Sequence, residues 1–203
     1  MLHTHSSQLI FNHNQGYRMT TIAVIYHSVT GTTQQLAEAI AEGVNDTNTA
    51  SALMLSISGK DIVDGRFVNH ELLAQIDSVD GVAFGSPTYM GCVSAQFKAF
   101  ADATGEIWCD QVWANKVAAG FTIGSNYSGD QLNTIQYLNT FANQHGMLWV
   151  GLDIPGGYDP QGRNRLGAQC GVIAQTTDTN VHETDLATAR HLGKRVASLA
   201  RAV

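Results

Sequence analysis

Charged residues are scarce in this chain of 203 residues. They make up 14% of the sequence, against 44% hydrophobic residues, and the net charge at pH 7 is −6. Proteins that bind nucleic acid without regard to sequence depend on a basic surface, which 11 Lys and Arg against 17 Asp and Glu do not provide. We therefore expect no nucleic-acid partner. The hydrophobic share predicts one α/β domain with a large buried core.

Cysteines and long apolar runs are also few. The three cysteines are an odd number without a C-x-x-C pair, which excludes a disulfide framework and indicates a reducing compartment. No apolar run approaches the roughly 20 residues of a membrane span, and residues 1–18 lack the apolar core of a signal peptide. We expect a cytoplasmic protein with no membrane span and no metal site. Residues 1–18 are predicted to be a flexible N-terminal extension, and residues 19–203 a single domain.

Two common nucleotide-binding motifs are missing after the first predicted strand. Ile22 to Tyr26 is a run of β-branched and aromatic residues that predicts a buried strand, and apolar residues spaced by four predict a helix over 34–44. Residues 27–33 between them contain neither the P-loop pattern G-x-x-x-x-G-K-[ST] nor G-x-G-x-x-G. They also lack the acidic cluster with which a receiver domain binds a metal.

This connection contains hydroxyl residues around one glycine: Ser28, Thr30, Gly31, Thr32 and Thr33. A helix N-terminus carries unpaired N–H groups and the positive end of the helix dipole, so it binds an anion without Lys or Arg. The alternative is that one hydroxyl merely caps the helix, but a cap needs one hydroxyl rather than four. The pattern predicts a site for a phosphate monoester.

Two further loops of similar composition follow the third and fourth predicted strands, over 79–85 and 116–122. Counting residues 27–33 as the first loop, the second is Gly85-Ser-Pro-Thr-Tyr-Met-Gly-Cys-Val-Ser94, and the third is Ile123-Gly-Ser-Asn-Tyr-Ser-Gly129. Open parallel sheets bind ligands at the carboxyl edge of their strands. Three such loops on one edge predict one shared site.

The remaining strands are predicted over 52–55 and 147–152, and a last amphipathic helix over 185–203. Residues 153–180 contain five glycines and are too long for an ordinary connection, which indicates a functional segment or an interface.

The three loops together resemble those of the flavodoxin-like FMN proteins, and more closely the WrbA-like NAD(P)H:quinone oxidoreductases, over about residues 20–203. The supporting segments are Gly85-Ser-Pro-Thr-Tyr-Met-Gly91, Gly105-Glu-Ile-Trp108, His145-Gly-Met147 and Ala187-Thr-Ala-Arg-His-Leu-Gly193. The resemblance implies a three-layer flavodoxin-like fold, with a five-stranded parallel sheet of order 2-1-3-4-5 and helices on both faces. It also implies FMN as cofactor, NAD(P)H as reductant, a quinone-like acceptor reduced by two electrons, and a homodimer or homotetramer.

The same resemblance implies which residues bind the cofactor. The phosphate would be held by Ser28, Thr30, Gly31, Thr32 and Thr33, and the ring by Pro87, Thr88, Tyr89, Met90 and Gly91 together with Thr122, Gly124, Ser125, Asn126, Tyr127 and Gly129. His145 is the candidate proton donor to a quinone, since the pKa of imidazole is near neutrality; the alternative is that it only closes a helix. Arg163 and Arg165 are candidates for contacting nicotinamide phosphates, with a solvated loop or a subunit contact as the alternative.

The chain departs from the relatives in places. The third loop is shorter, Gln144 stands where relatives often have a histidine, and Arg165-Leu166-Gly167-Ala168 replaces Pro-Tyr-Gly-Ala. Two other functions remain open. One is a flavodoxin-type electron carrier without its own substrate, although its usual strongly acidic docking face contrasts with a net charge of −6. The other is a flavin-free protein-interaction module, which an intact phosphate loop disfavours.

Overall fold

The computed structural model of this protein describes residues 18–203, so the predicted extension lies outside the described residues except for Arg18. The main strands are β1 (Thr20–Tyr26), β2 (Ala50–Ser56), β5 (Gly81–Pro87), β6 (Val117–Gly124), β7 (Leu148–Trp149) and β8 (Val172–Gln175). The helices are α1 (Thr32–Asn45), α2 (His70–Asp77), α3 (Ala95–Ala103), α4 (Gly105–Trp108), α5 (Gln131–Gln144) and α6 (Glu183–Ala200). A short helix, η1 (Gly59–Asp61), precedes a small hairpin of β3 (Ile62–Val63) and β4 (Arg66–Phe67).

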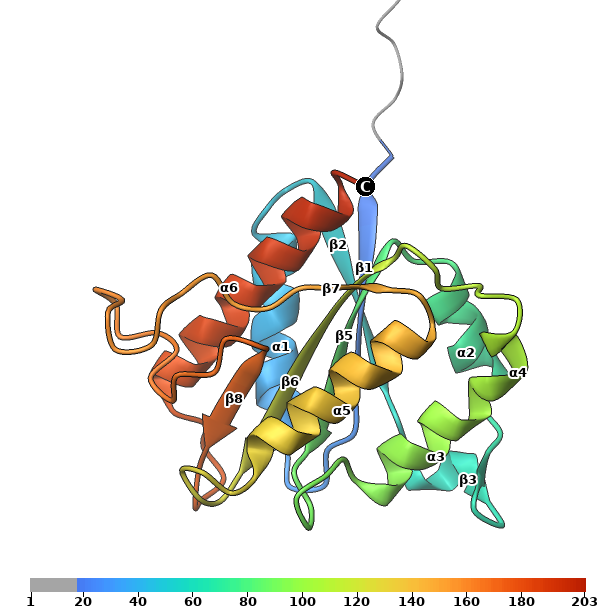
Figure 1. The fold of residues 1–203 in the computed structure, drawn as a ribbon, viewed down its shortest axis with the longest axis horizontal. Coiled ribbons are helices and arrows are strands. Elements are labelled where there is room, and N and C mark those ends of the chain that lie inside the picture. The colour runs from blue at the N-terminus through green and yellow to red at the C-terminus, as the bar shows by residue number, and fades with distance from the viewer. Residues whose placement is uncertain (1–17) are drawn as a thin grey trace, which may run out of the picture.

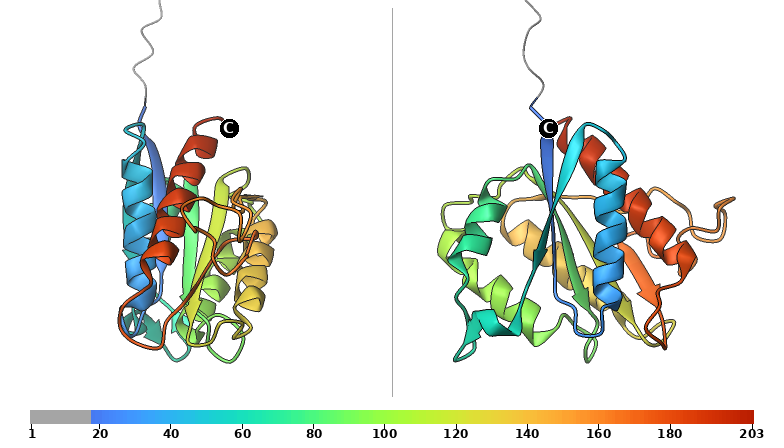
Figure 2. Two further views of the ribbon diagram at one scale, coloured as in Figure 1. Left: turned by 90° about the vertical axis from the view of Figure 1, so that its left-hand side faces the viewer. Right: turned by 180° about the vertical axis from the view of Figure 1, so that it is seen from behind.

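The main strands form one parallel sheet. Its order is β2-β1-β5-β6-β7, with β8 also paired to β6. The helices α1 and α6 cover one face, while α2, α3, α4 and α5 cover the other (Figures 1 and 2). This confirms the predicted α/β class, the strand order and the helices on both faces. Because every strand runs in the same direction, all strand-to-helix loops meet at the carboxyl edge, at the bottom of Figure 1.

The fifth position of the sheet differs in one respect from the predicted strand over 147–152. Two short strands share it: Leu148 pairs with Val117 at the start of β6, and Val172 pairs with Phe121 nearer its end. Between them the chain leaves the sheet, because Leu152 N donates to Gln169 O at 2.7 Å instead of to β6. The strand β8 lies inside the glycine-rich region and was not predicted.

Two apolar cores flank the sheet. One lies under α1 and α6, and the other contains an aromatic cluster of Phe84, Phe97, Phe100, Trp113 and Phe141 packed edge to face or tilted, with ring centroids 5.2–6.4 Å apart. Such aromatic pairs contribute beyond the area that they bury. The rigid sheet between these cores fixes the positions of the loops at its carboxyl edge.

The helices α1 and α6 approach each other unusually closely. A methyl group added to Gly43 would lie 2.0 Å from Arg190 O, and one added to Gly193 would lie 2.1 Å from Ile40 O. Glycine is therefore required at both crossing points. Over the part of the chain that the structure describes, no helix has the length and apolar character needed to cross a membrane.

Candidate functional site

The first loop joins β1 to α1 and leaves the helix N-terminus open. Gly31 is the N-cap residue at φ 87°, a left-handed conformation, and no side chain of the N-cap residue closes the helix. Ser28 Oγ lies 3.4 Å from Gln34 N, which is at most a weak contact, and the hydroxyls of Thr30 and Thr32 lie 3.1 Å apart. The first-turn N–H groups of α1 are therefore available to an anion, together with nearby hydroxyl donors.

The second loop follows β5 and is a tight turn. Tyr89 N donates to Cys92 O at 2.9 Å, and Cys92 N donates back to Tyr89 O at 3.1 Å. The two residues between them, Met90 and Gly91, have φ of 48° and 74°, as in a type I′ turn. The Met90 side chain is fully exposed at the tip. The turn thus forms a rigid edge beside the third loop. Thr88 N donates to Ile123 O of that loop at 2.9 Å.

A chain of buried hydroxyls lies behind these two loops. Thr122 Oγ1 donates its proton to Ser86 O at 2.7 Å. In the 2.8 Å bond between the two threonines, Thr88 Oγ1 is therefore the donor and Thr122 Oγ1 the acceptor. The hydroxyl of Thr134 then donates to Thr88 Oγ1 at 2.8 Å. Thr122 is fully buried. It therefore fixes the second loop to β6 and does not line the cleft, and its predicted contact with the cofactor stays a prediction.

A cleft of about 420 Å³ opens between the loops. It brings together residues from all three predicted loops: Thr30, Thr32, Pro87, Thr88, Tyr89, Gly124 and Ser125. The other predicted cofactor residues belong to the same loops but do not line the cleft: Ser28, Gly31, Thr33, Met90, Gly91, Asn126, Tyr127 and Gly129. A flat ligand with a phosphate tail would have its phosphate near Thr30 and Thr32, and its ring between Tyr89 and Gly124.

A fourth segment of the cleft was not predicted. Thr176, Thr177, Asp178 and Thr179 follow β8 and line the same cleft. The signal for it is present in the sequence, since the short β-forming run Val172–Gln175 precedes a hydroxyl-rich loop, as Ile22–Tyr26 does. A run of only 4 residues in a glycine-rich region does not by itself predict a strand.

His145 is not part of this cleft. It is the C-cap residue of α5, whose 14 residues begin at the loop edge and carry the chain about 20 Å away from it. Its ring is buried against Trp113 and Phe141, with centroids 4.5 and 5.2 Å away. His145 thus closes the helix, as in the alternative, and it does not line this chain's own cleft; the role of proton donor stays a prediction.

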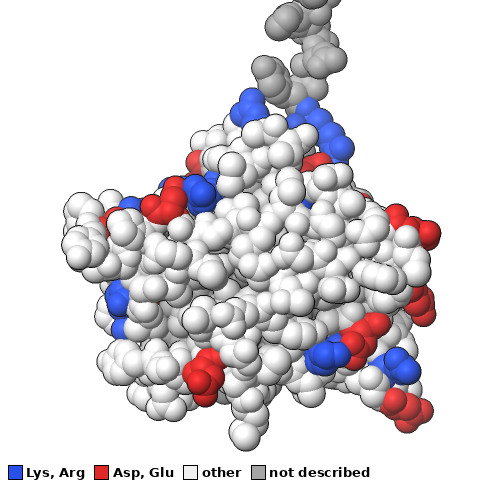
Figure 3. Space-filling model, in the orientation of Figure 1, with Lys and Arg blue, Asp and Glu red and all other residues white. Residues whose placement is uncertain are grey.

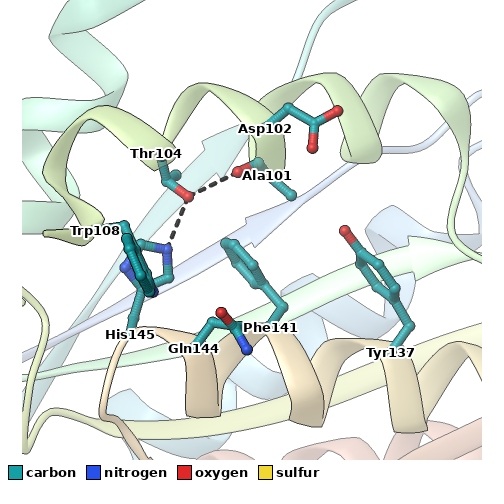
Figure 4. A pocket seen from close by; sticks show the side chains of 9 residues that line it. Ala101, Asp102, Thr104, Trp108, Tyr137, Phe141, Gln144 and His145 are labelled. Carbon is teal, nitrogen blue, oxygen red and sulfur yellow. Dashed lines mark hydrogen bonds between the residues drawn. The ribbon is translucent and has the colours of Figure 1, made fainter.

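The protonation state of His145 follows from its partner. Thr104 Oγ1 donates to Ala101 O at 2.7 Å and so accepts from His145 Nε2 at 2.8 Å (Figure 4). In the neutral ring Nδ1 then carries no proton, and within residues 18–203 it has no hydrogen-bond partner. Burial lowers the pKa of His145 below its ordinary value, because the charged ring would lose its water. The group is a neutral, structural histidine.

Arg163 and Arg165 are both held by carboxylates. Arg163 forms two bonds to Asp159, from Nη2 at 2.8 Å and from Nε at 3.1 Å, and Arg165 forms two bonds to Asp185 at 2.7 and 2.8 Å. Neither arginine lines the cleft. The ion pair of Arg165 attaches the segment 153–171 to α6, whereas that of Arg163 lies within the segment. The contact with nicotinamide phosphates stays a prediction, as does the alternative of a solvated loop or a subunit contact.

The residues of the cleft fit FMN. All 11 Lys and Arg of the sequence lie in the described residues, and none lines the cleft. A phosphate there would be bound by N–H groups and hydroxyls at an uncapped helix N-terminus, which suits a monoester on a short chain. The second and third loops offer main-chain groups and Tyr89 to a flat, uncharged ring.

Comparison with known proteins agrees with this geometry. Residues 20–154 match the family described as NADPH-dependent FMN reductase. Flavodoxin FldP of Pseudomonas aeruginosa is 33% identical over 189 residues, covering 89% of this chain and 97% of that protein. An NAD(P)H dehydrogenase (quinone) of Geotalea daltonii is 30% identical over 203 residues, covering 88% and 96%.

Among solved structures, the flavodoxin, WrbA-like protein from Agrobacterium tumefaciens is similar with a TM-score of 0.72. It is 39% identical to this chain, and the match covers 90% of this chain and 98% of the other. The family match spans more than half of the sequence and contains three of the four cleft loops. The chain therefore belongs to the NADPH-dependent FMN reductase family, as a WrbA-like, flavodoxin-fold, FMN-dependent oxidoreductase.

Proposed function

We propose that this protein is an NAD(P)H:quinone oxidoreductase that reduces quinone-type acceptors by two electrons at the cleft of the carboxyl edge. The observation that carries the proposal is the cleft itself, with an uncapped helix N-terminus and hydroxyls at one end and Tyr89 and Gly124 at the other. Relatives named NAD(P)H dehydrogenase (quinone) support the choice of acceptor.

When bound, FMN supplies the chemistry of accepting a hydride and passing on electrons. The chain's own residues bind and orient it. The N-terminus of α1 holds the phosphate, and the rigid turn from Tyr89 to Cys92 sets one edge of the ring site. Gly124 and Ser125 line the same cleft, where main-chain N–H groups of the third loop can stabilise developing negative charge. No side-chain nucleophile is needed.

An electron carrier is the second candidate, because Flavodoxin FldP is among the relatives. A carrier docks on its partners through a strongly acidic surface around the cofactor. The acidic residue that lines this cleft, Asp178, has its carboxylate engaged within its own loop, where Oδ1 accepts from Asn180 N at 2.7 Å. The weakly charged cleft supports an enzyme acting on a neutral quinone.

We also infer a homodimer or homotetramer. The helix α5 contains no charged residue among its 14, although Leu132, Asn133 and Gln136 are exposed on it. Figure 3 shows charged side chains gathered mainly at the periphery of this face. Beside α5 lies a pocket of about 360 Å³, lined by Trp108 and Tyr137 among others (Figure 4). An uncharged helix next to an exposed tryptophan is suited to a protein contact. Light scattering behind size-exclusion chromatography tests this: a monomer would contradict it.

The cytoplasmic location and a single domain over residues 19–203 stay predictions. The scarcity of cysteine supports the first, and the one main sheet with its two flanking cores supports the second.

Steady-state kinetics test the activity. The FMN-loaded protein should oxidise NADH or NADPH only when 1,4-benzoquinone is present, consuming one nicotinamide per quinone. One open face must serve both substrates in turn, so double-reciprocal plots should be parallel, as in a ping-pong reaction. Tight FMN binding with no quinone-dependent turnover by either nicotinamide would contradict the enzyme and favour the carrier.

A further inference from the structure

The segment Thr176–Thr179 forms a wall of the cleft that the family match, which ends at residue 154, does not include. It shares the cleft with Thr30 and Thr32 of the first loop. Three of its four residues carry hydroxyls. Its position depends on contacts with two other parts of the carboxyl edge.

One end of the segment is attached to the third loop. Thr176 N donates to Gly124 O at 3.1 Å, and Gln175 Nε2 donates to Ser125 O at 2.8 Å. The segment therefore leaves β8 directly beside the ring end of the cleft.

The other end is attached to α1 by a single side chain. Gln35, in the first turn of α1, donates from Nε2 to Thr179 O at 2.8 Å and accepts at Oε1 from Val181 N at 3.1 Å. The glutamine amide can form both bonds at once because its donor nitrogen and acceptor oxygen are attached to the same carbon. The partners in these two bonds are separated by 144 and 146 positions in the sequence.

The segment is also ordered from within. Thr176 Oγ1 donates to Asn180 O at 2.8 Å, and Asp178 Oδ1 accepts from Asn180 N at 2.7 Å. The carboxylate is thereby occupied inside the loop. The hydroxyls of Thr177 and Thr179 remain exposed at the cleft.

We propose that Gln35 is a positioning residue for the FMN phosphate, and that the segment Thr176–Thr179 which it holds is the second wall of the phosphate site. This rests on the FMN site described above. A phosphate dianion without a Lys or Arg nearby needs many neutral donors, and one helix end with Thr30 and Thr32 surrounds only one side of it. Holding Thr177 and Thr179 opposite that helix end closes the other side.

The test compares two neighbouring glutamines. Gln35→Leu removes both bonds to the segment, whereas Gln34→Leu removes only an exposed contact of 2.8 Å from Gln34 Nε2 to Glu38. Apoprotein is titrated with FMN and with riboflavin, and binding is followed by quenching of flavin fluorescence. Gln35→Leu should weaken FMN about tenfold and change riboflavin less than about twofold, while Gln34→Leu changes neither. The ³¹P resonance of bound FMN should shift in Gln35→Leu alone.

A second variant keeps the test decisive should Gln35→Leu fold poorly. Thr177→Val combined with Thr179→Val leaves the bonds of Gln35 intact and should also weaken FMN selectively. Equal losses for FMN and riboflavin, or an unchanged FMN affinity in both variants, would overturn the proposal. Failure of the wild-type protein to bind FMN would instead overturn the cofactor site itself, so the two failures are distinguishable.

Discussion

Arg165 and Asp185 form a two-pronged ion pair that attaches the segment 153–171 to α6. Arg165 Nη2 and Nε reach the two carboxylate oxygens at 2.7 and 2.8 Å, and the Asp185 side chain is 2% exposed. Asp185 Oδ2 also accepts from Gln175 N at 3.2 Å, so one buried carboxylate fixes both the segment and β8. The cleft wall after β8 thus depends on an ion pair outside the cleft.

The Asp185→Asn variant should therefore be strongly destabilised. The change leaves the Arg165 guanidinium without its charge partner in a mostly buried position, which costs about 3 kcal/mol in the free energy of unfolding. Glu42→Gln is the control, because Glu42 pairs with Arg190 at the surface, where the loss should stay under about 1 kcal/mol. Urea unfolding measures both, and equal losses would show that the buried pair has no special weight.

Acid should destabilise the protein through two buried histidines. Burial lowers the pKa of both His27 and His145 below the ordinary 6.5. As the pH falls below about 6.5, the unfolded chain therefore binds protons at these two histidines that the folded protein does not bind. Stability is then fully present above about pH 6.5 and falls as the pH drops toward the lowered folded values. Urea midpoints at pH 7.5, 6.5 and 5.5 should decrease in that order.

His145→Asn tests the assignment. This variant should be less stable at pH 7.5 but should lose less further stability between pH 7.5 and 5.5 than the wild type. An unchanged pH dependence would show that His145 titrates normally in the folded protein.

The crossing of α1 and α6 should reject even a methyl group. Gly43→Ala improves the intrinsic helix propensity, yet its Cβ would lie 2.0 Å from a carbonyl oxygen of α6, and forcing the helices apart should cost about 2–3 kcal/mol. Gly105→Ala is the matched control, since no atom lies within 4 Å of the added Cβ. Thermal unfolding that finds both variants equally stable would contradict the close helix packing.

The hydroxyls of the first loop should recognise phosphate specifically. Thr30→Val combined with Thr32→Val removes two donors near the N-terminus of α1 and should weaken FMN at least about tenfold, while riboflavin, which lacks the phosphate, binds nearly as before. Thr140→Val, on the exposed side of α5, is the control. Parallel losses for both flavins would show that these hydroxyls do not bind phosphate.

Much of the fold could be read from local patterns. Runs such as Ile22 to Tyr26 are β-forming and buried on both faces, and the spacing of apolar residues identifies α1 and α6. The order of the strands in the sheet follows from the family resemblance. The strand β8 could not be predicted in this way. Its 4 residues become a strand only by pairing with Phe121–Gly124, a contact between segments far apart in the sequence.

The candidate site shows the same division. Thr30, Thr32, Tyr89 and Gly124 could be placed because each follows a predictable strand. The sequence left two roles open for His145, proton donor and helix closure. Only the packing of its ring against Trp113 favours the structural role. The wall Thr176–Thr179 was missed together with the strand that positions it.

We propose that NAD(P)H reduces FMN in this cleft and that a quinone reoxidises it there. Anaerobic stopped-flow mixing of the FMN-loaded protein with NADH or NADPH tests it most directly, followed by a second mix with 1,4-benzoquinone. The account predicts loss of the oxidised-flavin absorbance near 450 nm, on the order of that expected for full two-electron reduction, and its complete return in the second mix. Persistence of the oxidised spectrum with both nicotinamides would contradict it.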